Sequence, residues 1–326
     1  MMAVVLDTDD RYRVTELGEP VPGPGQVAIR VAYAGIQWGD TMVRDGHFAV
    51  PRPFVPGFEA FGHIVAVGAG IDARRIGEAV TALTTSGPYA EVALAPAALA
   101  FGIGGLALRT AAGLGWGAAT AYDLINTAAN VRPGESVLIH AAAGSVGTLA
   151  AQFARLAGAG RIVGVVGSAV RADYAARFGY DRILLRGEFP AELGDARPDV
   201  ILDPVGGRTR TAGLGQLAAH GRLVAYGNLA SYEPVLADAN QLLMDGKSLL
   251  TYHSNLLGRT HPDRLAASAR RARGRHRAPG GGSTPPPSLG PGRPRRTLEG
   301  ARLEVRPRAS ARPRRRDDRG PGPPPP

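Results

Sequence analysis

Short runs that alternate apolar and polar residues fill the first third of the chain, and they predict a mostly β region. QVAIRVAYA (from Gln26) and GHIVAVG (from Gly62) are typical of strands. Stretches rich in Pro and Gly, such as PVPGPGQ and PRPFVPGF, separate such runs and indicate turns. We therefore expect a first, mostly β domain over residues 1–112.

From about Gly113 the pattern changes to short apolar, β-branched runs that alternate with Ala-rich helical stretches. Six runs read as strands, namely SVLIH, RIVGVV, RILL, DVILD, RLVAYG and SLLTY, beginning at Ser136, Arg161, Arg182, Asp199, Arg222 and Ser248. The spacing leaves room for a helix or crossover between successive strands. This order predicts an α/β domain over residues 113–252 with a doubly wound parallel sheet that is buried on both faces.

The end of the chain has no such pattern. HPDRLAASARRA begins like a helix, so we expect residues 253–270 to return as a helix toward the first domain. From Arg270 there are 13 prolines among 57 residues, few apolar residues and no regular period, which predicts a disordered tail over residues 271–326. Because GC-rich codons read off-frame encode chiefly Arg, Pro, Gly and Ala, we hypothesise a frameshift, which the coding DNA can test.

Charge and composition narrow the function classes. The net charge is +10, but the part up to Ala269 has 22 basic and 24 acidic residues, so the excess lies in the tail. The tail has neither interleaved aromatic residues nor a recognisable module, so we expect no specific nucleic-acid partner. The chain has no cysteine, no signal-peptide pattern at its start and no apolar run of membrane-spanning length, which favours a cytoplasmic protein without a membrane partner.

The segment LIHAAAGSVG (Leu138 to Gly147) lies between a predicted strand and the helical stretch TLAAQFARLAG. This order is the context in which a glycine-rich loop binds the pyrophosphate of a dinucleotide, as in the Rossmann fold. Ala142 stands at the first glycine position, while Gly144 and Gly147 match the other two. A tight turn without ligand remains the alternative. The candidate cofactor residues are Ala143, Gly144, Ser145, Val146 and Gly147.

The end of the second strand distinguishes the two nicotinamide cofactors. An Asp or Glu there would bind the ribose of NAD, but the sequence has Gly167 and Ser168, followed by Arg171. A hydroxyl and a guanidinium suit a 2′-phosphate, so NADP(H) is the predicted cofactor. Arg171 could instead be an ordinary solvated helix residue.

HAAAGSVG, PGFEAFGHIVAVG, AATAYDLI and ILDPVGG followed by GRLVAYGN together resemble the medium-chain dehydrogenases/reductases, in their zinc-free quinone oxidoreductase and enoyl reductase branch. The resemblance covers about residues 3–269. It implies a GroES-like β domain packed on a Rossmann domain. Zinc-dependent relatives have a Cys and a His where this chain has Gln37 and Phe58, so the resemblance implies no metal, although Glu59 remains. His63 and His140 are expected to be packed or hydrogen-bonded.

The same resemblance places candidate site residues. GIQWGDTMVRDGHF is similar to the branch's pattern, with Gln37 in place of Asn, Phe48 in place of Tyr, and Asp40 and Arg44 retained. The catalytic candidates are Gln37, Asp40 and Arg44, although Asp40 and Arg44 could form only a structural ion pair. Thr120, Gly227 and Asn228 complete the cofactor candidates, with a turn cap as the alternative role of Asn228. For Trp38 and Trp116, packing is favoured over lining the substrate cleft.

The function implied is hydride transfer from NADPH to a quinone or an α,β-unsaturated carbonyl compound, an enone or an enoyl substrate, in the manner of quinone oxidoreductases or enoyl reductases. The alternative is a protein of this fold that binds NADP and has little activity, because its ending departs from the family. An Arg-rich nucleic-acid-binding arm is a third and weaker reading. A homodimer paired through the strand SLLTY is also expected from the resemblance.

Overall fold

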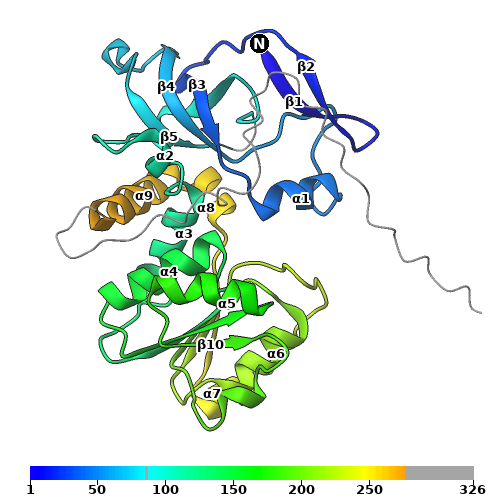
Figure 1. The fold of residues 1–326 in the computed structure, drawn as a ribbon, viewed down its shortest axis with the longest axis vertical. Helices are drawn as coiled ribbons and strands as arrows, with labels where there is room; N and C mark the ends of the chain where they lie inside the picture. The colour runs from blue at the N-terminus through cyan, green and yellow to red at the C-terminus, as the bar shows by residue number, and fades with distance from the viewer. Residues whose placement is uncertain (85–86, 277–326) are drawn as a thin grey trace, which may run out of the picture. The chain divides into compact units, whose positions relative to one another are not determined.

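The computed structural model describes residues 1–84 and 87–276. Two large β-sheets and a two-stranded one organise them, with helices on and between the large sheets (Figure 1). No helix within these ranges has the length and hydropathy that a bilayer crossing requires. The predicted tail from residue 277 onward, including the frameshift hypothesis, lies outside the described residues.

The first sheet is antiparallel and has the strand order β6-β3-β4-β5-β7. Its strands, in chain order, are β3 (Gln26–Ala34), β4 (Glu59–Val67), β5 (Ala79–Leu83), β6 (Val92–Pro96) and β7 (Ala100–Gly102). A hairpin of β1 (Met2–Leu6) and β2 (Tyr12–Glu16) precedes them, and the short helices α1 (Trp38–Arg44) and α2 (Leu108–Ala111) lie in the same part of the chain. The predicted β region is confirmed.

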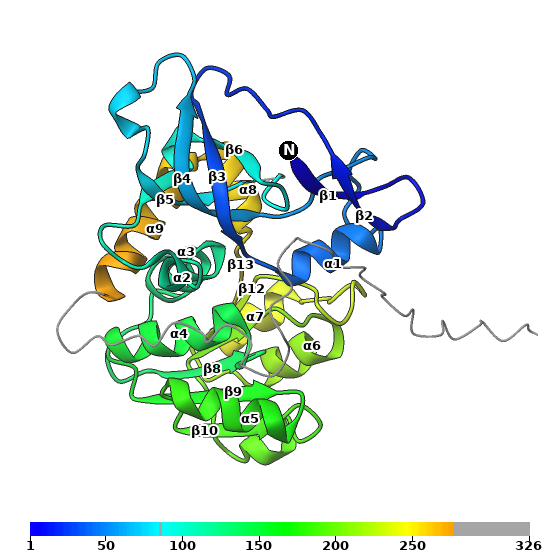
Figure 2. The same cartoon turned by 45° about the horizontal axis from the view of Figure 1, so that its top comes forward.

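The second sheet is parallel and has the order β10-β9-β8-β11-β12-β13, which is the doubly wound Rossmann arrangement. Its strands are β8 (Ser136–His140), β9 (Arg161–Val166), β10 (Arg182–Leu185), β11 (Val200–Asp203), β12 (Arg222–Ala225) and β13 (Ser248–Thr251). All six predicted strands are therefore present. The helices that accompany this sheet are α4 (Ser145–Leu156), α5 (Ala169–Ala175), α6 (Gly207–Gln216) and α7 (Ala239–Asp245), shown beside it in Figure 2.

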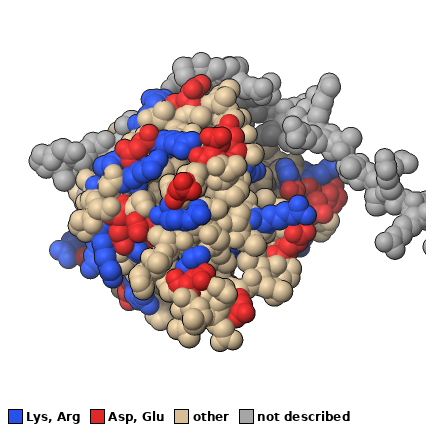
Figure 3. All heavy atoms as spheres, turned by 90° about the horizontal axis from the view of Figure 1, so that it is seen from below, with Lys and Arg blue, Asp and Glu red and all other residues tan. Residues whose placement is uncertain are grey.

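Successive residues of the central strands contribute to cores on opposite faces of this sheet. Val137 and Ile139 of β8 pack in the core that contains Leu149 and Phe153 of α4, while Leu138 between them packs in the other core. This is the consequence of the two-residue period of a strand, and it explains why these strands read as continuous apolar runs. The face of the molecule in Figure 3 shows Lys and Arg intermixed with Asp and Glu among uncharged residues.

Three helices, α3, α8 and α9, lie between the two large sheets (Figure 1). Helix α3 (Trp116–Asp123) continues as a π-helix (Leu124–Ala128), and α8 (Ser254–Thr260) and α9 (Pro262–His276) follow β13. Leu265, Ala266 and Ala269 of α9 are buried in a core with Leu83, Leu99, Phe101 and Trp116.

The predicted boundary of the tail at residue 271 is wrong by six residues, since α9 extends to His276. Ala272 and Arg273 continue the buried face that begins at Leu265, at helical spacing. The guanidinium of Arg273 donates a hydrogen bond to the main-chain oxygen of Gly102. The periodicity was not recognised in the sequence because Arg273 is a charged residue type. A search for apolar residues at helical spacing does not count it. The predicted single return helix is also divided in two, with the break at His261 before Pro262.

Candidate active site

The glycine loop joins β8 to α4 and leaves the first amides of α4 free to bind an anion. Gly144 is the N-cap of α4 and its N–H donates to the oxygen of Ala141 at 2.8 Å. A Cβ on Gly147 would meet the oxygens of Ala141 and Ala142 at 2.5 and 2.8 Å, so only glycine permits this close packing of helix on strand. The N–H groups of Ser145 and Val146 lie in the first turn, where the helix dipole favours a negative charge.

Ala142 is fully buried beside Gly164 of the neighbouring strand β9, on which a Cβ would approach the Cβ of Ala142 to 2.9 Å. The residue of this loop with a left-handed conformation is Ala141, with φ of +54°. A methyl group at position 142 is therefore compatible with the turn, and a larger side chain is not.

A cavity of about 410 Å³ lies at the carboxyl edge of the parallel sheet. Its lining includes Ala141 and Ala143 of the glycine loop, then Val166, Gly167, Ser168 and Arg171 after β9, and Arg186, Val205, Leu229, Ala230 and Trp38. Two guanidinium groups and a hydroxyl thus share one wall, and the residues that line the cavity include no Asp or Glu. This chemistry fits a phosphate monoester better than an uncharged ribose.

Arg186 is the residue of this cavity that sequence reasoning missed. It follows β10, and its main-chain N–H donates to the oxygen of Val166 at 2.7 Å, because β10 pairs in parallel with β9. A Cβ on Gly167 would lie 3.4 Å from the Nη2 atom of Arg186. The signal that could have found it was available: parallel strands end at the same edge, so the residue after RILL had to lie beside the residue after RIVGVV.

Asn228 and Gly227, after β12, are held by Arg210 of α6. Its Nη1 donates to Oδ1 of Asn228 at 3.1 Å and its Nη2 donates to the oxygen of Gly227 at 2.6 Å. The Nε of Arg210 bonds the fully buried Asp203 at 2.7 Å. The side chain of Asn228 is thus held by Arg210, two residues before Ala230 in the cavity wall.

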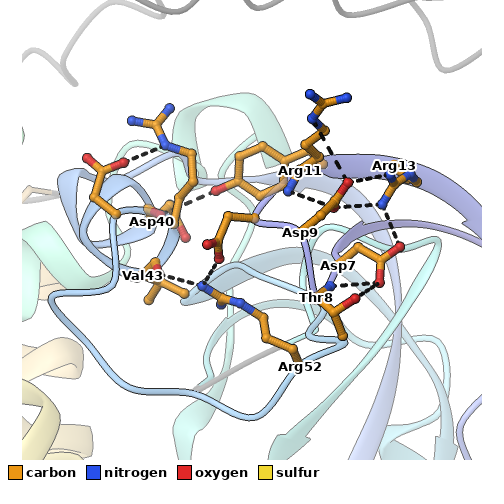
Figure 4. A network of polar contacts seen from close by, with 12 residues as sticks. Asp7, Thr8, Asp9, Arg11, Arg13, Asp40, Val43 and Arg52 are labelled. Atoms are coloured by element: carbon orange, nitrogen blue, oxygen red, sulfur yellow. Dashed lines mark hydrogen bonds and ion pairs between the residues drawn. The ribbon is translucent and has the colours of Figure 1, made fainter. Parts of the chain in front are cut away.

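On the side of the first sheet, Gln37 is the N-cap of α1 and its main-chain N–H donates to Oδ2 of Asp40 at 2.8 Å. Oδ2 of Asp40 also accepts the hydroxyl of Tyr89 at 2.8 Å, and burial raises the pKa of this carboxyl. Figure 4 shows the neighbouring network, in which Arg52 donates to the main-chain oxygen of Val43 and pairs with Asp10. Asp40 therefore fixes the loop that carries Gln37.

Arg44 does not pair with Asp40, so the suggested ion pair between them is not formed. Its Nε pairs with Asp45 at 2.7 Å on the surface. Trp38 differs from the prediction that it packs in the interior, because it is 58% exposed and lines the cavity. Trp116 is buried as expected, and its indole N–H donates to the oxygen of Phe58 at 2.5 Å. Thr120 is buried on α3 and is not among the residues that line the cavity.

A larger cavity, of about 550 Å³, lies against α8 and α9 and contains none of the predicted site residues. Its wall includes the buried Asp123, which accepts the hydroxyls of Ser268 at 2.6 Å and Tyr252 at 2.8 Å. These bonds join α3, the residue that follows β13, and α9. The network is satisfied internally and so serves to hold the helices together.

Known proteins resemble this chain in both fold and sequence. The alcohol dehydrogenase GroES-like domain model matches residues 23–112, and the zinc-binding dehydrogenase model matches residues 145–267. A mycobacterial quinone oxidoreductase is 27% identical with a TM-score of 0.74, covering 84% of this chain and 88% of that one. The Escherichia coli quinone oxidoreductase complexed with NADPH is 25% identical with a TM-score of 0.73, covering 84% and 87%.

The chain belongs to the medium-chain dehydrogenase/reductase superfamily, in its quinone oxidoreductase branch. Among curated relatives, a probable quinone oxidoreductase of Schizosaccharomyces pombe is 38% identical over 138 residues, or 42% of each chain. The human synaptic vesicle membrane protein VAT-1 homolog is 32% identical over 206 residues, covering 61% of this chain and 52% of the relative. The matches thus span about a third to a half of the curated relatives' length.

Some medium-chain dehydrogenases/reductases bind zinc, so the positions of possible metal ligands in this chain matter. Within residues 1–84 and 87–276, no group of three or more His, Cys, Asp or Glu side chains is placed to hold a metal ion. His140 is buried in edge-to-face contact with Phe189, and burial lowers its pKa to about 4, while His63 is exposed. Both histidines therefore have the environments of packed or solvated residues.

Proposed function

We propose that this chain is an NADPH-dependent oxidoreductase that reduces a quinone or an α,β-unsaturated carbonyl compound without a metal ion. The observation that carries the proposal is the cavity at the carboxyl edge of the parallel sheet, where Ser168, Arg171 and Arg186 meet and no carboxylate opposes a 2′-phosphate. Two solved relatives are complexed with NADPH, the Escherichia coli quinone oxidoreductase and a mycobacterial protein that is 29% identical with a TM-score of 0.76.

The fit of NADP(H) follows from the chain's own groups. The first-turn amides of α4, at Ser145 and Val146, suit the pyrophosphate, and Arg171 and Arg186 suit the 2′-phosphate. NADPH would supply a hydride, and the protein would supply alignment and a hydrogen-bond donor for the substrate oxygen. Gln37 is the donor we assign, since the chain has Phe48 where relatives often have a hydroxyl. Asp40 holds the main chain of Gln37, and Arg44 has no part in this arrangement.

The absence of metal from the proposal rests on side-chain chemistry. At the two positions that bind zinc in zinc-dependent relatives, Gln37 and Phe58 offer an amide and a phenyl ring. Treatment with a chelator should therefore leave turnover unchanged, and a loss of turnover that added zinc restores would contradict this part of the proposal.

The test is oxidation of NADPH, followed by absorbance, with quinones, 2-alkenals and acyl-CoA enoyl compounds, using protein of verified mass. Turnover with NADPH at a rate well above that with NADH supports the proposal. Binding of NADPH without turnover on any of these substrates would select the alternative, a nucleotide-binding protein of this fold. A homodimer through β13, the edge strand of the parallel sheet, is a further part of the proposal, tested by solution mass.

A further inference from the structure

Glu59, the first residue of β4, is a buried carboxylate to which the reaction as proposed assigns no role. It is 8% exposed, and it accepts the main-chain N–H of Trp116 at 2.6 Å. The side-chain amide of Gln37 also interacts with this carboxyl and favours its charged form. The carboxylate thus joins the loop before α1, on the side of the first sheet, to the first residue of α3.

Two glycines from distant parts of the chain enclose this carboxylate. A Cβ on Gly35 would overlap its Oε1 atom, and a Cβ on Gly115 would overlap its Oε2 atom. Any other residue at either position would displace the carboxylate. The backbone around Glu59 is therefore shaped to admit this side chain and to hold it in one position.

On balance, the environment of Glu59 disfavours its negative charge. None of the ion pairs formed by the described residues includes it, and burial, with the charge of Asp40 added, raises the pKa of its carboxyl. Burying a carboxylate without a cation costs stability, so uncharged neighbours such as the Trp116 N–H do not by themselves account for its presence. A residue that is unfavourable for stability and yet tightly enclosed is most simply explained by a role in the site.

The two partners of Glu59 lead to opposite sides of that site. An amide that donates one N–H to a carboxylate must turn its NH2 group toward it, which leaves the second N–H of Gln37 for another acceptor. Trp116 begins the helix on which Gly117 packs against Ser145 of the glycine loop, where a Cβ would lie 3.4 Å away. Glu59 is therefore connected to the assigned donor and, through α3, to the loop assigned to the pyrophosphate.

We propose that Glu59 is a positioning residue for hydride transfer: it orients the Gln37 amide with its N–H groups available and fixes the start of α3 relative to it. The inference rests on the proposed function, and it explains why a carboxylate without a cationic partner is buried at this position. Glu59 itself is not among the residues that line the cavity.

The decisive variant is Glu59→Gln. Its side chain keeps the size of Glu59 and an oxygen for the Trp116 N–H, but it turns an NH2 group toward Gln37, which must then present its own oxygen. Because the substrate oxygen loses its donor, we expect kcat to fall by about tenfold or more, as for loss of one hydrogen bond to developing charge. The dissociation constant of NADPH, measured by calorimetry, should not change, and the melting temperature should stay the same or rise.

The same sheet offers a matched control in Glu78. It is a part-buried glutamate directly before β5 that pairs with Arg75 at 2.7 Å, and a Cβ on Gly102 would approach its Oε1 atom to 2.4 Å. Glu78→Gln is expected to leave kcat unchanged. A wild-type kcat for Glu59→Gln, or a parallel loss of kcat and stability in that variant, would overturn the inference.

A readout independent of turnover separates this inference from the proposed function. In hydrogen exchange, Glu59→Ala should speed exchange of the Trp116 amide by about tenfold, while Glu78→Ala should not. If wild-type protein turns over no substrate, the proposed function fails. Unchanged exchange of Trp116 in Glu59→Ala would then overturn the link between Glu59 and α3 as well, and faster exchange would support it.

Discussion

Replacement of Arg186 by Met tests whether the cavity after β9 selects the phosphorylated cofactor. The substitution removes one guanidinium from the wall shared with Ser168 and Arg171 and keeps an apolar stem of similar length. NADH has no 2′-phosphate. The variant should therefore weaken NADPH binding and leave NADH binding unchanged.

The size of the effect follows from the exposure of the cavity. A hydrogen bond to a charged group contributes about 1.5–3 kcal/mol, and an exposed ion pair less than about 1 kcal/mol. Arg186 and Arg171 are both solvent-exposed, which favours a value near 1.5 kcal/mol for Arg186. We therefore expect the dissociation constant of NADPH to rise about tenfold, since 1.4 kcal/mol corresponds to a factor of ten. Raising the ionic strength should also weaken NADPH binding more in the wild type than in the variant, because the wild type has one more charge to screen.

The assay is calorimetric titration with NADPH and NADH in parallel. Arg182→Met is the matched control, because Arg182 begins the strand that Arg186 follows, pairs with the exposed Glu192 at 3.3 Å and does not line the cavity. Equal losses of NADPH and NADH affinity in Arg186→Met would mean that Arg186 supports the fold of the cavity. No loss for either cofactor would refute the assignment of the 2′-phosphate to this wall.

Three further outcomes follow from buried contacts. Ala142→Val should cost about 1–3 kcal/mol of unfolding free energy in urea, because Gly164 leaves no room beside Ala142; an unchanged midpoint would show that the loop adapts. Arg210→Met should cost about 3 kcal/mol and weaken cofactor binding, because Asp203 keeps only main-chain donors. Burial lowers the pKa of His140 from 6.5 to about 4, so the unfolded state binds the extra proton. Stability should then be full above pH 6.5 and fall by about 3 kcal/mol as the pH drops toward 4; His140→Leu should abolish this slope.

The sequence predicted the second sheet well because each strand carries its own signal. Runs such as SVLIH and DVILD are apolar throughout, which is what burial on both faces requires. The glycine loop could be interpreted for the same reason, since strand, turn and helix follow one another along the chain. The position of Ala142 in a buried contact with β9 explains why alanine stands there, and this reason became visible only when the neighbouring strand was placed.

Features that depend on distant segments escaped prediction. The enclosure of Glu59 requires Gly35 and Gly115, which are 80 residues apart in the sequence and have no local pattern in common. Arg44 matched a family pattern, yet its partner is the adjacent Asp45. The Arg-rich composition also led to a wrong end for α9. Arg273 belongs to the buried face of this helix because its long side chain reaches the main-chain oxygen of Gly102.

The contrast between the two tryptophans gives the protein an internal optical probe. Trp116 is 5% exposed and Trp38 is 58% exposed in the cavity wall, and the chain contains no other tryptophan. Quenchers in solution should reach Trp38 first, and a ligand that enters the cavity should shield it. The intrinsic emission of the unlabelled protein can therefore report occupancy at a single indole, so that ligands can be ranked even before a substrate is known.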